Sequence, residues 1–210
     1  MALNRWLPLL ILLLPGRPAS LVAQRRLAWD ASLGASGTAE RAALSAWRQV
    51  AVAPLGARIA LGVRVSGYGG DAAGYTNRGT IQAGLPGTLV LTPGVFGLNG
   101  AVAGELPVGP LLVGANLDLV GLSAGPSRGQ GTREHQPQTF SYFGYEARDH
   151  GALNSEFYVA VRGSRGLTWR AGASHYVTNH IVTDVAAAGR PSARYQRFET
   201  VLFGAVRLER

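Results

Sequence analysis

The sequence has no cysteine, and charged residues make up only 15% of its 210 positions. The absence of cysteine excludes disulfide frameworks, thiolate metal sites and cysteine nucleophiles. The charged fraction lies well below the roughly 25% of an average soluble domain. No stretch after residue 23 holds the ~18 consecutive apolar residues that a membrane-spanning helix needs. These absences exclude a disulfide-rich module and argue against a mature protein anchored by an apolar helix.

Glycine, in contrast, is abundant, at 29 residues. This is about twice its usual share of roughly 7%. Because glycine is costly in helix interiors, a long helical bundle is not expected. The hydrophobic content of 47% is too high for a disordered chain, and the length suits one domain.

The first 23 residues predict a secretory signal peptide. Arg5 supplies a positive charge, residues 6–14 carry no charge, and the small residue Ala23 precedes Gln24 at the expected cleavage site. The mature domain, residues 24–210, carries 18 arginines against 12 acidic residues, a net charge of +6. A buried N-terminal helix and a retained anchor are the alternatives.

Apolar and polar side chains alternate along much of the mature chain. In residues 57–68, Ile59, Leu61 and Val63 fall on one face, whereas Arg58 and Arg64 fall on the other. A period of two residues is typical of a β-strand with one apolar and one polar face. The same pattern returns in residues 157–164, 167–176 and 197–209.

Eight strands are expected, near residues 28–36, 46–54, 57–68, 89–105, 111–123, 154–164, 167–179 and 195–208. Short connections at 55–56, 106–110 and 165–166 alternate with long ones at 37–45, 69–88, 124–153 and 180–194. Short turns at one end and long loops at the other are typical of outer-membrane barrels. The sequence therefore predicts an all-β fold, an eight-stranded antiparallel up-and-down transmembrane β-barrel preceded by a signal peptide.

The two faces of such a barrel can be placed in two ways. In a membrane barrel the apolar side chains face lipid and the polar ones face the lumen. A soluble periplasmic ligand-binding β-barrel reverses the faces, and a period of two residues fits both. The small and charged polar faces favour the membrane barrel. So do the aromatic residues near predicted strand ends, where girdles form, namely Trp29, Phe157 and Trp169.

Five segments carry a family resemblance: residues 57–70, 113–125 with an Asn-x-Asp core at Asn116 and Asp118, 151–158, 170–175 and 194–198. They resemble an uncharacterised bacterial outer-membrane β-barrel family, of the small eight-stranded type. The resemblance implies an outer-membrane barrel with no assigned activity. One departure is the ending Leu208-Glu209-Arg210, since such barrels commonly end on an aromatic residue that the assembly machinery reads.

The face predicted to line the lumen is rich in charge. Opposite charges attract strongly in a narrow lumen, although lost hydration offsets much of the gain. We interpret these side chains as a structural ionic network, with a gated ion or solute path as the alternative, and expect Asp118 to pair with an arginine such as Arg64. Glu105 is a further candidate. The predicted members are Asp30, Arg58, Arg64, Asn116, Asp118, Arg162, Arg170, Glu199 and Arg207.

Two catalytic patterns occur in unsuitable settings. The run from Gly121 to Gly125, centred on Ser123, matches the G-x-S-x-G nucleophile elbow, but no helix is predicted after it. Some outer-membrane lipid A hydrolases carry a serine two residues from a histidine. Here the residue two after His175 is Val177, and Ser174 falls on the opposite strand face.

Metal binding is also weakly supported. His175 and His180 are expected on opposite faces near the outer rim, and His135 and His150 lie in a long loop beside acidic residues. We predict no catalytic, metal or cofactor site and no enzymatic activity.

The predicted protein is an integral protein of the cell outer membrane of a Gram-negative bacterium. Its lumen is plugged, and its role is structural or is carried by its outer loops. Expected partners are outer-membrane lipid and lipopolysaccharide, the barrel-assembly machinery during biogenesis, and a surface ligand at loop 124–153, with no nucleic acid. The alternatives are a lipid-modifying outer-membrane enzyme and the soluble periplasmic barrel.

Overall fold

The computed structural model describes residues 25–52, 56–78, 85–142 and 153–210. The predicted signal peptide, with its cleavage site at Ala23 and Gln24, lies outside this part of the chain. The thirteen elements of the described residues are all β-strands. Within these ranges there is no helix long and apolar enough to cross a membrane.

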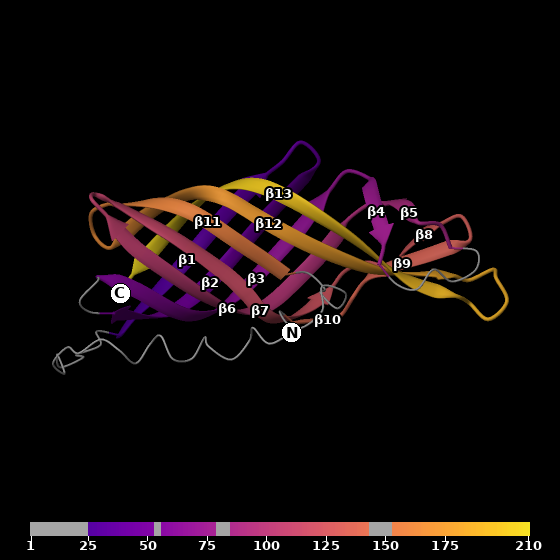
Figure 1. Ribbon diagram of the computed structural model, residues 1–210, viewed down its shortest axis with the longest axis horizontal. Helices are drawn as coiled ribbons and strands as arrows, with labels where there is room; N and C mark the ends of the chain where they lie inside the picture. The colour runs from indigo at the N-terminus through magenta and orange to yellow at the C-terminus, as the bar shows by residue number, and fades with distance from the viewer. Residues whose placement is uncertain (1–24, 53–55, 79–84, 143–152) are drawn as a thin grey trace, which may run out of the picture.

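Eight of the strands form a closed antiparallel ring (Figure 1). Each pairs with its neighbour in chain order, and the last strand pairs with both the one before it and the first. The closed eight-stranded up-and-down topology predicted from the sequence is therefore confirmed. The ring strands are β1 (Arg25–Ala35), β2 (Ala39–Val52), β3 (Ala57–Gly70), β6 (Gly94–Val108), β7 (Leu111–Ala124), β11 (Leu153–Arg162), β12 (Leu167–Asp184) and β13 (Ser192–Glu209).

The two ends of the ring differ. The start of β1, the end of β13 and the short β6–β7 and β11–β12 connections lie at one end, here called the turn end. At the opposite, far end, β12 and β13 continue beyond β11 as a long hairpin (Figure 1). Together with the short far-end strands this hairpin forms the outer extension. Those strands are β4 (Ala73–Asn77), β5 (Thr88–Leu91), β8 (Arg128–Gln130) and β9 (Arg133–Pro137), whereas β10 (Phe140–Tyr142) pairs with β7 within the ring.

Three predicted boundaries are wrong. The connection expected at 37–45 is a tight turn, because β2 already begins at Ala39 and pairs with β1 from Glu40 onward. The strand expected at 89–105 is broken between Leu91 and Gly94, where Pro93 has no backbone N–H to donate. The loop expected at 180–194 is mostly strand, since the β12–β13 ladder runs on to Thr183 and Ser192.

The predicted faces of the ring are confirmed. Large apolar side chains point outward and are well exposed, for example Leu33 at 71%, Leu61 at 66% and Leu202 at 71%. The inward side chains are buried and largely polar or small. Glycine creates room for bulky inward side chains, since a Cβ atom at Gly114 would lie 2.5 Å from the ring of Tyr158.

One irregularity keeps the polar face of β7 inward along its whole length. Gly100 on β6 pairs with Val120, but the next residue, Ala101, pairs with Asp118, so Leu119 is an extra residue in β7. A β-bulge of this kind shifts the alternation by one residue. Asp118 before the bulge and Gly121 after it therefore both face the lumen.

The bulge yields a test of lumen packing. A Cβ atom at Gly121 would lie 1.8 Å from Oδ1 of Asn99, whose amide donates to Asp118 at 2.7 Å. We expect Gly121→Ala to displace Asn99 and lower the free energy of unfolding by about 1–3 kcal/mol, the usual cost of overpacking. Urea unfolding of the refolded barrel measures this loss.

The matched control is Gly104→Ala on neighbouring β6, where a Cβ atom would meet nothing within 4 Å. Its unfolding midpoint should stay at the wild-type value. Equal midpoints for both variants would contradict the tight packing around Asn99.

Candidate functional site

The lumen near the turn end is filled by a first ionic cluster centred on Asp30. This carboxylate accepts hydrogen bonds from Trp47 Nε1 at 2.7 Å and Arg207 Nε at 2.8 Å, and it lies 2.8 Å from Arg170 NH2. Arg207 also donates to Glu105, which accepts a hydrogen bond from the Tyr158 hydroxyl at 2.7 Å. We call these residues the turn-side cluster.

A second cluster lies in the middle of the lumen and centres on Glu156. Its carboxylate binds Arg41 and lies 3.3 Å from Arg64 NH2. It also accepts hydrogen bonds from the amides of Asn116 at 2.7 Å and Asn154 at 3.0 Å. We call this group, together with Asp118, the middle cluster.

The structure places Arg64 against Asp118, the pairing expected from the sequence. The distance from Arg64 NH1 to Asp118 Oδ1 is 2.9 Å. The guanidinium of Arg64 also lies 5.8 Å from the ring centre of Trp47, so Arg64 joins the two clusters. Four arginines face four carboxylates across both clusters, and all eight residues are buried: Arg41, Arg64, Arg170, Arg207, Asp30, Glu105, Asp118 and Glu156.

Three predicted network members lie at the two ends of the barrel, outside both clusters, which corrects the sequence interpretation. Arg58 sits at the turn end and binds Glu209 at 2.7 Å. Arg162, the last residue of the β11–β12 ladder, is exposed at the mouth. Glu199 lies at the far rim, where it binds Arg197 and the hydroxyl of Ser36.

Sequence reasoning missed Glu156 and Arg41. Glu156 shares its strand face with Tyr158, so the period-two pattern contained the signal needed to find it. Arg41 was assigned to a loop, because the alanine-rich start of β2 gives a weak alternation. The side chain of Asn99, which holds Asp118, was also missed.

Aromatic side chains lie in the lumen beyond the middle cluster. Tyr68 and Tyr176 stack with ring centres 4.6 Å apart and planes within 7°. The two rings belong to an apolar cluster with Ala39, Val95 and Val201. The Tyr176 hydroxyl lies 3.3 Å from Ser66 Oγ.

The outer extension contains a buried histidine pair. The ring centres of His135 and His180 are 5.5 Å apart, and Tyr75 packs edge-on against His180 at 5.2 Å. Nδ1 of each histidine is buried without a hydrogen-bond partner. Burial lowers the pKa of His180 to about 4, and burial together with the nearby charge of Arg128 lowers the pKa of His135.

This geometry corrects the expectation that both His175 and His180 sit at the rim. His175 is exposed and stacks on Phe198, whereas His180 is buried. Among the described residues no group of three or more histidine, aspartate or glutamate side chains could hold a metal ion. His150 lies outside the described residues.

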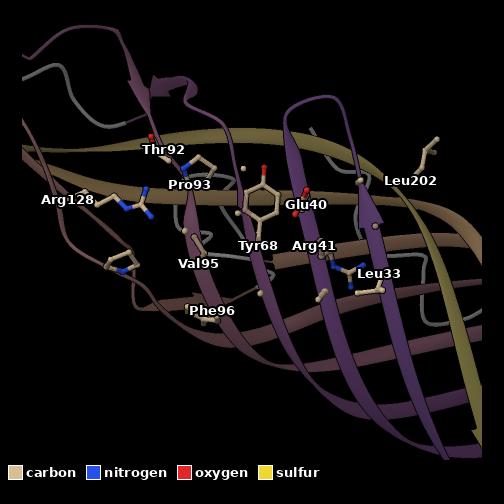
Figure 2. Close-up of a pocket in the computed structure, with 18 residues that line it drawn as sticks. Leu33, Glu40, Arg41, Tyr68, Thr92, Pro93, Val95, Phe96, Arg128 and Leu202 are labelled. Carbon is tan, nitrogen blue, oxygen red and sulfur yellow. The ribbon is translucent and has the colours of Figure 1, made fainter.

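A hollow of about 950 Å³ lies over the far ends of β1, β2, β3 and β6 (Figure 2). Outward apolar side chains line it, including Leu33, Phe96 and Leu202. The charged residues of the lining are Glu40, Arg41 and Arg128, and Arg128 and Leu202 lie at opposite sides in the view of Figure 2. The lining therefore suits a hydrocarbon chain with a charged group beside it.

The two catalytic patterns remain unsuitable. Ser123 is a buried residue of β7, and its strand leads into further turns and strands instead of a helix. Ser174 faces the lumen and donates to Asn154 at 2.5 Å, whereas His175 faces outward.

The loop expected at 124–153 contains β8, β9 and β10 in its described part. β9 pairs with β12 in the outer extension, and β10 pairs with β7. Residues 143–152 of this loop lie outside the described ranges.

No protein-family model matches this sequence, and no curated protein matches it. Among solved structures the chain is similar to Neisserial surface protein A, with 10% identity, a TM-score of 0.40 and coverage of 88% of this chain and 94% of the other. It is similar to a major outer membrane protein from Thermus thermophilus, with 13% identity, a TM-score of 0.35 and coverage of 88% and 99%. A loop L8 deletion mutant of OmpT, an outer membrane protein of Vibrio cholerae, gives 11% identity and a TM-score of 0.21, with coverage of 92% and 66%.

The middle cluster predicts a strong dependence of stability on Glu156. The variant Glu156→Gln leaves two buried guanidiniums, those of Arg41 and Arg64, without the carboxylate between them. Removing one partner of a buried ion pair costs about 3–5 kcal/mol. The free energy of unfolding in urea should fall by this amount, while Glu134→Gln, at an exposed position of β9, should leave it unchanged. Equal stabilities of the two variants would rule out the ionic role of Glu156.

The histidine pair predicts that the outer extension opens at low pH. Both pKa values are lowered in the folded state, so protonation favours the open form. The extension should be fully stable above pH ~6.5, and its opening should rise roughly tenfold per pH unit between pH ~6.5 and ~4 for one linked proton. Hydrogen-exchange protection of β9 amides measures this, with amides of the β1–β2 ladder as internal control. Protection of β9 that stays constant across this range would contradict the prediction.

Proposed function

We propose that this protein is an integral barrel of the cell outer membrane. The observation that carries the proposal is the apolar outer wall, which surrounds a polar, charge-balanced lumen. Large exposed apolar side chains occur on all eight ring strands. A soluble monomer rarely exposes a contiguous apolar patch of more than a few hundred Å², so apolar side chains around the whole ring favour a lipid surrounding.

The closed backbone ladder supports the same location. Lipid offers no hydrogen bonds to a strand edge, so a sheet in a bilayer must close on itself. Here β13 pairs with both β1 and β12, and the ring has no edge. The side-chain placement disfavours the soluble periplasmic barrel, which needs apolar side chains inside and polar ones outside.

We further propose that the lumen is closed to ions. The two clusters occupy successive levels of the lumen, and the stacked rings of Tyr68 and Tyr176 follow them toward the far end. Eight strands leave an interior just wide enough for side chains to fill. An ion crossing this lumen has to separate buried arginine–carboxylate pairs.

The role of the protein is then structural, or it is carried by contacts of the outer extension. The hollow beside Arg128 supports contact with lipopolysaccharide, since it combines an apolar lining with a cation suited to a phosphate. Assembly into the membrane requires the barrel-assembly machinery. The described part of loop 124–153 offers strands β8 and β9 for a surface ligand.

Two measurements test the proposal. The expressed protein should fractionate with the outer membrane and change its gel mobility on boiling, because a closed barrel resists detergent until it is heated. Reconstituted into a planar bilayer, it should give no steady conductance. A soluble protein without a heat shift would overturn the membrane location, and a stable open channel would overturn the closed lumen.

A further inference from the structure

A second hollow, at the turn end, differs from the rest of the lumen in its charge. It has a volume of about 200 Å³ and is lined by Arg26, Gln49, Ala51, Gly56, Arg58 and Arg162. Three of these six residues carry a guanidinium, and none carries a carboxylate. We call this hollow the mouth pocket.

The lining of the mouth pocket is positive, whereas the two lumen clusters have equal numbers of arginines and carboxylates. Glu209 lies beside the pocket, where it binds Arg58 at 2.7 Å and lies 3.8 Å from Arg26. Glu209 is thus shared by two guanidiniums. The exposed side chain of Arg162 is a third guanidinium at the rim of the pocket. The lining of the mouth pocket therefore favours an anion.

A second observation concerns Gln49. Only 4% of this residue is exposed, it lines the mouth pocket, and its Oε1 atom is buried without a hydrogen-bond partner. A buried amide oxygen without a donor costs free energy, and a ligand hydroxyl supplies that donor.

We propose that the mouth pocket binds a phosphate group. Guanidinium groups match phosphate oxygens in charge and in planar geometry, and they bind them through paired hydrogen bonds. A singly protonated phosphate also carries an O–H that donates to Gln49, which sulfate lacks at neutral pH. The volume suits a phosphate with a small substituent and excludes a nucleic acid chain.

The phosphate has two possible sources. One is a small phosphate or phosphate monoester dissolved next to the turn end, and the other is a lipid headgroup of the adjacent membrane leaflet. The binding chemistry is the same, and the site does not depend on the closed lumen. Only the lipid source depends on the proposed membrane location.

In the first experiment, inorganic phosphate is titrated into the folded full-length barrel in detergent at neutral pH and constant ionic strength. Calorimetry measures the binding affinity. Arg162→Gln should weaken phosphate binding roughly tenfold, the usual effect of losing one charged hydrogen bond. Arg162 is exposed, so this variant should fold normally. The matched control is Arg165→Gln, which removes the same charge from the adjacent turn without touching the mouth pocket.

Sulfate serves as the second probe and should bind more weakly than phosphate. Gln49→Leu should abolish this preference while leaving arginine-dependent anion binding in place. Equal affinities of the wild-type protein for sulfate and phosphate would overturn the assignment to phosphate.

The lipid source is tested with phosphatidylcholine vesicles containing or lacking phosphatidic acid. If phosphatidic acid raises the melting temperature of the wild-type protein and of Arg165→Gln but not of Arg162→Gln, the phosphate belongs to a lipid. If inorganic phosphate binds with the same dependence on Arg162 while phosphatidic acid leaves the melting temperature unchanged, the phosphate comes from a soluble source. If neither probe distinguishes Arg162→Gln from Arg165→Gln, the proposed site is wrong.

Discussion

The pairing of β13 with both β1 and β12 is the constraint on which the rest of the structure depends. It converts a meander of antiparallel strands into a ring with an inside and an outside. Once the ring is closed, alternation along every strand sends one set of side chains outward and the other into the lumen. The apolar wall and the ionic lumen are therefore two consequences of a single closure.

The narrow ring also dictates the chemistry of the lumen. Buried charges are tolerated only when they are paired and hydrogen-bonded. Asp30 and Glu156 meet this condition by binding two arginines each, and amide or indole groups bind their remaining oxygen lone pairs. The bulge at Leu119 contributes to this charge pairing, because it keeps Asp118 on the lumen face next to Arg64.

Much of this fold could be predicted from the sequence, since period-two alternation is a local property. Residues 57–68 and 167–176 show it plainly, and both lie in ring strands as expected. The start of β2 was not predicted, because alanine residues are compatible with either face of a strand. The inward position of Arg41, which lies in this part of β2, was therefore not predicted either. The three-dimensional partners of Glu156 come from β2, β3 and β7, so no local pattern could reveal them. The positive lining of the mouth pocket likewise becomes visible only when Arg26, Arg58 and Arg162 are brought together from three strands.

The β12–β13 hairpin is a single ladder that runs from Leu167 and Leu208 at the turn end to Thr183 and Ser192 in the outer extension. Near its base it carries Arg170 and Arg207, which both contact Asp30. Toward its tip it carries His180 and Tyr195. One uninterrupted backbone ladder therefore links the outer extension to the ion pairs at Asp30, so the hairpin belongs to both parts of the protein.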